Sequence, residues 1–343
     1  QYSGAIWYPM VYEMDETKKK QLCVEKVESQ FARATRYVEA IHATTVVPSA
    51  GPPCFLDPQL FSLNMITGDE ISIFPDQTEF QRRLSDEGRL NAATTIPGTT
   101  FTVLGGGVTV EQPMSGEDIT RIFTHKAEYL AKYQADYAQW LIDARASWAS
   151  PSTDIIATLK LWWEPLMAMA TSVRKGIGAN CLINAGDIQI YINFVDGLVQ
   201  PYTDQPFGFR FDIARDLVEN VVAKRAVDWS NSLFLSARFT AWRAGDYNEY
   251  IYNFFKSLSV ERMSRTESEA KNKLNGVPSN EGDIEIGDYT VQRRCPHRNA
   301  DLSVFGEIDG DDLVCTLHGW RFDLETGACR NAEERPIRVK KRS

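Results

Sequence analysis

Histidine and long apolar runs are scarce in this sequence. Four histidines occur among 343 residues, so an imidazole metal site has few ligands to draw on. No apolar run approaches the roughly 18 residues of a membrane-spanning helix, and the most apolar stretch, residues 159–170, is interrupted by Lys160, Glu164 and Pro165. A net charge of −9 argues against nucleic acid as a partner. We therefore expect no membrane span and no bound nucleic acid.

The sequence also lacks the cysteine pattern of a disulfide framework. Of its six cysteines, Cys23, Cys54, Cys181 and Cys329 are dispersed, and the other two each lie close to a histidine. Dispersed thiols are typical of a reducing compartment, so we expect a cytoplasmic protein. The composition, 43% hydrophobic and 24% charged, is that of an ordinary globular chain with two or three domains.

Two short motifs near the end of the chain carry the clearest chemistry. Cys295-Pro-His297 is followed by Cys315-Thr-Leu-His318, so each motif offers one thiolate and one imidazole. One iron can then take both cysteines and the other both histidines, which is the ligand division of a Rieske [2Fe-2S] cluster. We predict that Cys295, His297, Cys315 and His318 bind this cofactor and its iron atoms.

The same four residues could hold a structural zinc ion, since zinc accepts cysteine and histidine. Zinc fingers place their cysteines together and their histidines on a helix, whereas here each cysteine has its own histidine on a segment typical of a β-loop. We therefore favour the cluster. Neutral imidazoles raise its potential to about −150 mV or above, against about −400 mV for plant-type ferredoxins, so electrons should flow from a ferredoxin into it.

Basic residues crowd the sequence around both motifs and predict a docking surface for an acidic ferredoxin or ferredoxin reductase. They are Arg293, Arg294, Arg298, Arg321, Arg330, Arg335, Arg338, Lys340, Lys341 and Arg342. The alternative is that they pair with nearby carboxylates, which are Asp301, Glu307, Asp309, Asp311, Asp312 and Asp323.

The first part of the chain, residues 1–105, predicts an α/β layer. Residues 4–12 are typical of a core strand, residues 13–41 of an amphipathic helix and residues 44–47 of a buried strand, and a turn-rich loop follows at 48–55. This part resembles the C-terminal half of a metallo-β-lactamase-like domain. The His-x-His-x-Asp-His metal motif of that domain is absent from this chain.

The middle part, residues 106–274, predicts an α+β module. A capping box beginning at Ser115 opens a long amphipathic helix to about Trp148. Apolar and polar residues alternate over 188–194 and 207–211, which indicates strands with one buried face, and helices are expected from Ile213 and from Tyr247. The module resembles sterol-carrier-like domains. A polar linker at 271–282 leads into an all-β Rieske domain at 283–343, so the fold class is α+β multidomain.

The chain resembles the bacterial UDP-N-acetylmuramic acid hydroxylases along nearly its whole length, and four segments carry this resemblance. They are residues 2–9 (YSGAIWYP), 47–53 (VPSAGPP), 228–232 (DWSNS) and the Rieske block. The resemblance implies a Rieske-type monooxygenase that uses O₂ to hydroxylate the N-acetyl group of a UDP-sugar to N-glycolyl, with electrons from NAD(P)H through a ferredoxin-type donor. Leu317 departs from the tyrosine that many Rieske oxygenases carry there.

Such a reaction needs a mononuclear iron, commonly held by two histidines and a carboxylate. Outside the cluster motifs the chain offers only His42 and His125, both of which we interpret as structural or solvated. We therefore expect the mononuclear iron mainly on a segment that precedes Gln1, so that this chain alone is incomplete as an enzyme. The catalytic residues stay unassigned, and a homo-oligomer is compatible with the sequence.

Three arginines of the middle part, Arg210, Arg238 and Arg243, lie near aromatic residues and could bind the diphosphate of a UDP-sugar. The alternative for each is a surface ion pair. Two other functions stay open at this point. One is a Rieske electron-transfer protein without its own substrate, and the other is a module that holds an apolar ligand and senses redox state through the cluster.

Overall fold

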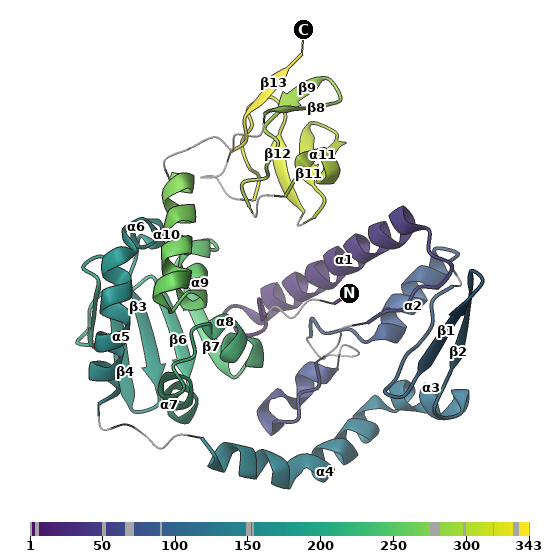
Figure 1. Ribbon diagram of the computed structural model, residues 1–343, viewed down its shortest axis with the longest axis horizontal. Helices are drawn as coiled ribbons and strands as arrows, with labels where there is room; N and C mark the ends of the chain where they lie inside the picture. Colours follow the sequence, from purple (N-terminus) through teal and green to yellow (C-terminus); the bar gives the residue numbers. More distant parts are fainter. Residues whose placement is uncertain are drawn as a thin grey trace. The chain divides into compact units, whose positions relative to one another are not determined.

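The computed structural model describes residues 2–3, 7–49, 53–65, 72–89, 91–148, 152, 154–274, 282–297, 300–317, 319–331 and 336–342. The chain divides into two compact units, Gln1–Lys271 and Asn272–Ser343 (Figure 1). Among the described residues, no helix combines the length and the apolar character that a bilayer crossing requires.

A five-stranded sheet organises the second half of the first unit. Its strand order is β5 (Leu198–Pro201), β4 (Ile188–Asn193), β3 (Cys181–Ala185), β6 (Phe209–Ile213) and β7 (Phe239–Arg243). Only β3 and β6 are parallel, and the other neighbours are antiparallel. The predicted alternation over 188–194 is confirmed, because Ile190 and Ile192 enter the core while Gln189 is exposed. The sheet therefore has one apolar face and one polar face.

Helices pack on the apolar face of this sheet (Figure 1). They are α5 (Ile155–Met169), α6 (Thr171–Ile177), α7 (Arg215–Ala223), α8 (Trp229–Ser232), the 3₁₀ helix η2 (Phe234–Ser236), α9 (Glu249–Lys256) and α10 (Val260–Leu274). Large rings fill the space between layers: Trp163 lies 5.0 Å from Trp229 and 5.9 Å from Phe255 between ring centroids. Aromatic rings bury much apolar area each, so this core is densely filled.

The first half of the unit is mainly helical. Its elements are α1 (Glu16–Ile41), the 3₁₀ helix η1 (Pro58–Asn64), α2 (Gln77–Asp86), β1 (Thr100–Leu104), β2 (Gly107–Glu111), α3 (Gly116–Thr124) and α4 (Lys126–Ala146). The helix predicted over 13–41 is confirmed and begins after Asp15, whose side chain accepts a hydrogen bond from the Lys18 amide. Phe31 of α1 and Phe80 of α2 join a small separate core, with centroids 5.3 Å apart.

Two strand predictions in this half are wrong. Of the predicted strand 4–12, residues 4–6 lie outside the described part, residues 8–11 form a turn, and Tyr12 makes a single bridge to Ala241. Pro9 has no N–H to give to a ladder, which explains why the segment does not continue as a strand. The strand predicted at 44–47 is likewise reduced to one bridge between Val46 and Ala92, just before Pro48.

The long helix predicted from Ser115 to Trp148 is also wrong in its continuity, because it is broken at His125. The backbone of His125 leaves the helical region, with φ −115° and ψ 39°, so α3 ends there and α4 begins at Lys126. The N-cap half of the capping box is confirmed, because the Ser115 hydroxyl accepts a hydrogen bond from the Asp118 amide at 3.1 Å. The Asp118 carboxylate accepts from the Ser115 hydroxyl at 2.6 Å, and not from the Ser115 backbone N–H as a full capping box requires.

The hairpin of β1 and β2 turns at Gly105 and Gly106, whose φ values are +57° and +82°. Positive φ at both central positions is the requirement of the tight hairpin turn that glycine meets most easily. The predicted boundary between residues 105 and 106 therefore falls inside a hairpin. The division at this point stays a prediction.

Two contacts join the helical half to the sheet. Residues 11–13 pair with the outer edge of β7, where Ala241 N–H donates to Val11 at 2.7 Å and Glu13 N–H donates to Ala241 at 2.9 Å. Asp57, which precedes η1, accepts hydrogen bonds from Arg238 Nε and Nη2 at 3.0 and 2.6 Å and also pairs with Arg145 of α4. These contacts make the two halves one unit.

The second unit is rich in β-structure, as predicted. One sheet has the order β10 (Gly306–Asp309), β11 (Asp312–Cys315), β12 (Trp320–Asp323), and the other has the order β13 (Val339–Lys341), β9 (Tyr289–Val291), β8 (Ile284–Ile286). A single helical turn, α11 (Leu302–Phe305), interrupts the all-β pattern that the sequence predicts. A compact core joins both sheets and includes three cysteines, Cys295, Cys315 and Cys329.

Candidate iron-sulfur centre

The two predicted cysteine ligands come from different sheets and meet in one core. Cys315 is the last residue of β11, and Cys295 follows β9 in a loop that returns through a bridge between Arg294 and Asp301. Backbone hydrogen bonds fix both loops: the Cys295 amide donates to Ala300 at 2.9 Å, and the Gly319 amide donates to Cys315 at 2.8 Å. Gly319 takes a φ of +73°, which glycine adopts without a steric cost.

The thiols of Cys295 and Cys315 are fully buried and lie beside each other. A hydrogen bond between them, together with burial, raises the pKa of Cys295 far above its usual range. Two neutral thiols are held here at a position where two thiolates would repel each other. A cationic iron centre resolves this conflict, because it stabilises the deprotonated form of its ligands. The pair therefore fits one iron of a [2Fe-2S] cluster.

His297 follows Cys295 and is positioned by an aromatic neighbour. Its ring stacks on Trp320 at the start of β12, with centroids 4.5 Å apart and planes inclined by 7°. His318, the fourth predicted ligand, lies outside the described residues. The described part thus brings three of the four predicted ligands into one loop region of the Rieske unit, with two sulfur donors and one imidazole.

Most described arginines around the motifs form ion pairs within the unit. Asp301 pairs with Arg293 at 3.0 Å and with Arg294 at 3.7 Å, and the remaining pairs are Arg321 with Asp309 and Asp312, Arg330 with Asp312 and Asp323, Arg338 with Asp283, and Arg342 with Glu285. The pairing alternative holds for Arg293, Arg294, Arg321 and Arg330, whereas Arg338 and Arg342 pair with carboxylates outside the predicted set. Arg298 and Arg335 lie outside the described residues.

The two remaining histidines occupy structural positions. His42 is the exposed C-cap of α1, with a φ of +51°, and His125 is exposed at the break between α3 and α4, 3.1 Å from the Thr124 hydroxyl. These positions agree with the structural interpretation of both. Within the described ranges, which omit His318, no group of three or more His, Cys, Asp or Glu side chains is arranged to hold a metal ion.

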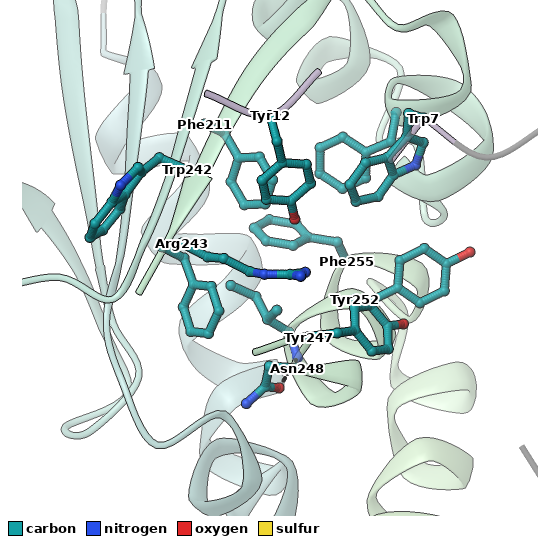
Figure 2. Close-up of a pocket in the computed structure, with 12 residues that line it drawn as sticks. Trp7, Tyr12, Phe211, Trp242, Arg243, Tyr247, Asn248, Tyr252 and Phe255 are labelled. Carbon is teal, nitrogen blue, oxygen red and sulfur yellow. Dashed lines mark hydrogen bonds between the residues drawn. The ribbon is translucent and has the colours of Figure 1, made fainter. Parts of the chain in front are cut away.

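The three arginines considered for substrate binding have different surroundings. Arg210 pairs with Glu13 and Asp212, and Arg238 pairs with Asp57, so both take the ion-pair alternative. Arg243 instead lies over aromatic rings (Figure 2), 4.9 Å from the centroid of Tyr12 and 5.2 Å from that of Tyr8. Among the residues that the structure describes, carboxylate partners are found for Arg210 and Arg238 but not for Arg243.

Comparison with known protein families assigns two domains to this chain, both after residue 154. The model of the Rv3818-like, SCP2-like domain matches residues 155–272, and the model of the Rieske [2Fe-2S] domain matches residues 278–340. The chain thus carries an SCP2-like domain followed by a Rieske [2Fe-2S] domain. The sterol-carrier-like resemblance of the middle part and the C-terminal Rieske domain are both confirmed.

Mycobacterial relatives align with nearly the whole of this chain. The chain is homologous to Rv3818 of Mycobacterium tuberculosis, which is named as a Rieske 2Fe-2S iron-sulfur protein, with 39% identity over 342 residues. A protein of the same description from Mycolicibacterium smegmatis is 38% identical over 349 residues. These alignments cover 98% and 99% of this chain but 66% of each relative. The printed names give neither a substrate nor an activity.

Shorter similarities are confined to a small share of the chain. A 4beta-methylsterol monooxygenase of Methylococcus capsulatus is 54% identical over 35 residues, which is 10% of this chain and 9% of that protein. No solved structure matches the chain significantly. Neither matching family model reaches residues 1–154.

Two features of the candidate sites were missed in the sequence. The motifs do not single out Trp320, although it follows the second motif closely and its ring stacks on that of His297. Trp7, Tyr8 and Tyr12 were assigned to a strand, yet they pack around β7 and Arg243. Three aromatic residues within one short segment could have indicated that the segment packs against another element, because aromatic side chains bury large apolar areas.

Proposed function

We propose that this chain is the electron-accepting part of a Rieske-type monooxygenase that hydroxylates the N-acetyl group of UDP-N-acetylmuramic acid to N-glycolyl. The observation that carries the proposal is the burial of paired thiols and a supported imidazole in a Rieske unit joined to an SCP2-like domain. The substrate comes from the resemblance of residues 2–9, 47–53 and 228–232 to the hydroxylase family.

The short similarities support the oxygenase class. The proteins that match 10–25% of the chain are named as a sterol monooxygenase, an O-demethylase oxygenase subunit, an N1-demethylase and cholesterol 7-desaturases. Two of these names state an oxygenase activity directly, and the others state a desaturase or a demethylase. An iron-sulfur protein with this relationship is most simply an oxygenase component.

The proposed reaction balances with one O₂ and two electrons. One oxygen atom enters a C–H bond of the N-acetyl methyl group, and the other leaves as water after taking two protons. NAD(P)H supplies both electrons as a hydride equivalent, and a reductase and ferredoxin deliver them one at a time in the cytoplasm. When bound, the [2Fe-2S] centre supplies single-electron transfer at a potential above that of plant-type ferredoxins.

The oxygen-activating iron needs ligands of its own. The mycobacterial relatives are longer, and this chain covers 66% of each. We place the mononuclear iron ligands on the remaining third of such a protein, in a metallo-β-lactamase-like domain of which residues 1–105 form part. Exposed His42 and His125 are then free of any ligand role.

An electron-transfer protein without its own substrate is the alternative. The observation that favours it is that the described residues hold no group of three or more His, Cys, Asp or Glu side chains arranged as a mononuclear metal site. The cluster would then pass electrons to a separate oxygenase chain.

The deciding experiment uses the full-length relative of this chain with its cluster reconstituted. NADPH, ferredoxin reductase, ferredoxin, isotopically labelled O₂ and UDP-N-acetylmuramic acid are combined, and the sugar nucleotide is analysed by mass spectrometry. Incorporation of one labelled oxygen atom into the N-acyl group is the expected result. Cluster reduction and reoxidation with no labelled product would contradict the monooxygenase and favour the alternative.

A further inference from the structure

Trp320 lies directly across a hairpin from one of the predicted cluster ligands. It is the first residue of β12, and the register of β11 and β12 pairs it with Cys315. The Gly319 amide, which donates to the Cys315 carbonyl at 2.8 Å, closes the connection between the two strands. The hydrogen bonds of this hairpin therefore fix the backbone of Trp320 relative to a thiol ligand.

The indole of Trp320 reaches the other ligand loop. His297 follows β9, a strand of the other sheet, and its ring stacks on the indole with centroids 4.5 Å apart and planes inclined by 7°. Residues two apart in a strand point to the same face, and Phe322, which is fully buried, lies 6.3 Å from the indole. One side chain thus connects the core, the hairpin that carries Cys315 and the loop that carries His297.

Parallel stacking suits an imidazole that binds a metal. Such an imidazole uses one ring nitrogen, which lies at the edge of the ring. A ring parallel to it covers the face and leaves both nitrogens accessible at the edge, whereas a hydrogen bond would occupy one of them. The parallel ring also opposes rotation of the imidazole about its Cβ–Cγ bond, because a rotated imidazole would collide with the indole. Trp320 is therefore placed to orient His297 without competing for its nitrogens.

Core packing alone does not account for this stack. The rings of Trp320 and His297 are half-buried at the edge of the core, whereas Phe322 fills its centre. Covering a polar imidazole also gains less from burial than covering an apolar side chain. What the stack does achieve is to keep water from one face of a predicted ligand. Solvent exposure is one of the factors that set the reduction potential of an iron-sulfur cluster.

We infer that Trp320 is a positioning residue for the [2Fe-2S] cluster, because its stack on His297 fixes the direction of this imidazole relative to Cys315 and shields it from water. Partners that orient a metal ligand tune the metal as well as hold it. Trp320 binds no iron in this inference. The inference depends on the cluster assignment, which the Rieske domain match supports, and not on the proposed substrate. Removing the indole should therefore change the properties of a cluster that still assembles.

The test compares Trp320→Leu and Trp320→Phe in the cluster-loaded chain, with Tyr289→Leu as the matched control. Tyr289 of β9 is also half-buried at the edge of this core, but among the described residues no ring contact joins it to His297. Three properties are measured without any substrate. They are the reduction potential, the coupling of the unpaired electron of the reduced cluster to the imidazole nitrogens in pulsed EPR, and the rate at which a chelator removes the iron.

We expect Trp320→Leu to shift the potential and the nitrogen couplings. We also expect the chelator to remove its iron about 10- to 100-fold faster, in line with the loss of metal affinity when a partner that orients a ligand is removed. Trp320→Phe keeps a ring that can stack on His297, so all three properties should stay close to those of wild type. Tyr289→Leu should leave them unchanged.

The inference is overturned if Trp320→Leu keeps the wild-type potential and nitrogen couplings. A lower Tm with an unchanged cluster would mean that the indole only fills the core. It is also overturned if Trp320→Phe changes the cluster as much as Trp320→Leu does, because stacking would then not be the cause. Should Trp320→Leu not hold a cluster, Trp320→Met, which keeps a longer apolar side chain without a ring, is judged by the same two criteria.

Discussion

Replacing Asp57 with asparagine should destabilise the first unit strongly, because Asp57 is the buried centre of an ion-pair network. Its side chain is 3% exposed, and it pairs with Arg238 and Arg145, which are 31% and 44% exposed. Burial alone would raise the pKa of Asp57, but hydrogen bonds and charge from Arg238, with those of Arg145, lower it below the usual carboxyl value. The ionised form is therefore the one that stabilises the fold.

The magnitude follows from the loss of charge-assisted hydrogen bonds at a buried position. Breaking a buried ion pair costs about 3–5 kcal/mol, and because both arginines reach solvent and can be hydrated, we expect about 3 kcal/mol for Asp57→Asn. For a unit of this size that corresponds to a decrease in Tm of about 6–12 °C. Tryptophan fluorescence reports mainly on the first unit, because residues 272–343, which form the other unit, contain only one tryptophan, Trp320.

The matched control is Glu261→Gln, which removes an exposed pair between Glu261 and Arg265, 83% and 69% exposed. Surface pairs of this kind contribute about 0.5 kcal/mol or less. The reasoning is refuted if Asp57→Asn changes the free energy of unfolding no more than this control does. Because the pKa of Asp57 is lowered in the fold, its contribution is present above the usual carboxyl pKa and is lost as the pH falls. The difference between wild type and Asp57→Asn should therefore shrink in acid.

Three further outcomes are expected. Cys295→Ser should abolish the visible absorption and the bound iron of the cluster. The control Cys329→Ser, which removes another buried thiol of the same core, should keep both. Equal loss in the two variants would remove Cys295 from the ligand set. Burial lowers the pKa of Lys26 to about 7, so wild-type stability should rise as the pH increases from there toward the ordinary lysine value, and urea titrations of Lys26→Met should lack this rise. Lys340 and Lys341 are exposed on β13, and replacing both with glutamine should slow reduction of the cluster by an acidic ferredoxin at low ionic strength but not in high salt. Stopped-flow absorption measures the rate. Rates that match wild type in low salt would argue against docking at these lysines.

The sequence was most informative where local pattern and chemistry coincide. The cysteine and histidine spacing identifies the Rieske domain, and the alternation of Ile190 and Ile192 with polar neighbours predicts a strand with one buried face, as β4 has. The capping box at Ser115 also predicts the start of α3 correctly. Each of these features depends on residues close together in the chain, so a single sequence contains the whole signal.

The remaining features depend on partners far away in the sequence. Val46 is apolar and β-branched like a strand residue, but its only bridge partner is Ala92, so the strand does not extend. The core-facing position of Arg243 follows from its register with Phe209, and the cover of Tyr8 and Tyr12 follows from a segment at the other end of the unit. The local sequence does not predict with which sheet edge a distant segment will pair. Such tertiary contacts can override the strand propensity of a segment.

The attachment of residues 11–13 to β7 has a consequence for how the first unit is made. An outer strand with unpaired backbone groups attracts other chains, and in this unit Val11 and Glu13 occupy the backbone groups of Ala241 on that edge. Contacts between segments that lie far apart in the sequence form late, because the long loop between them must be closed first. During synthesis residues 11–13 therefore cannot pair with β7 until β7 has been made. Until that pairing forms, the unpaired edge of β7 can bind other chains. Variants that weaken this attachment should lower the yield of soluble protein before they alter the cluster.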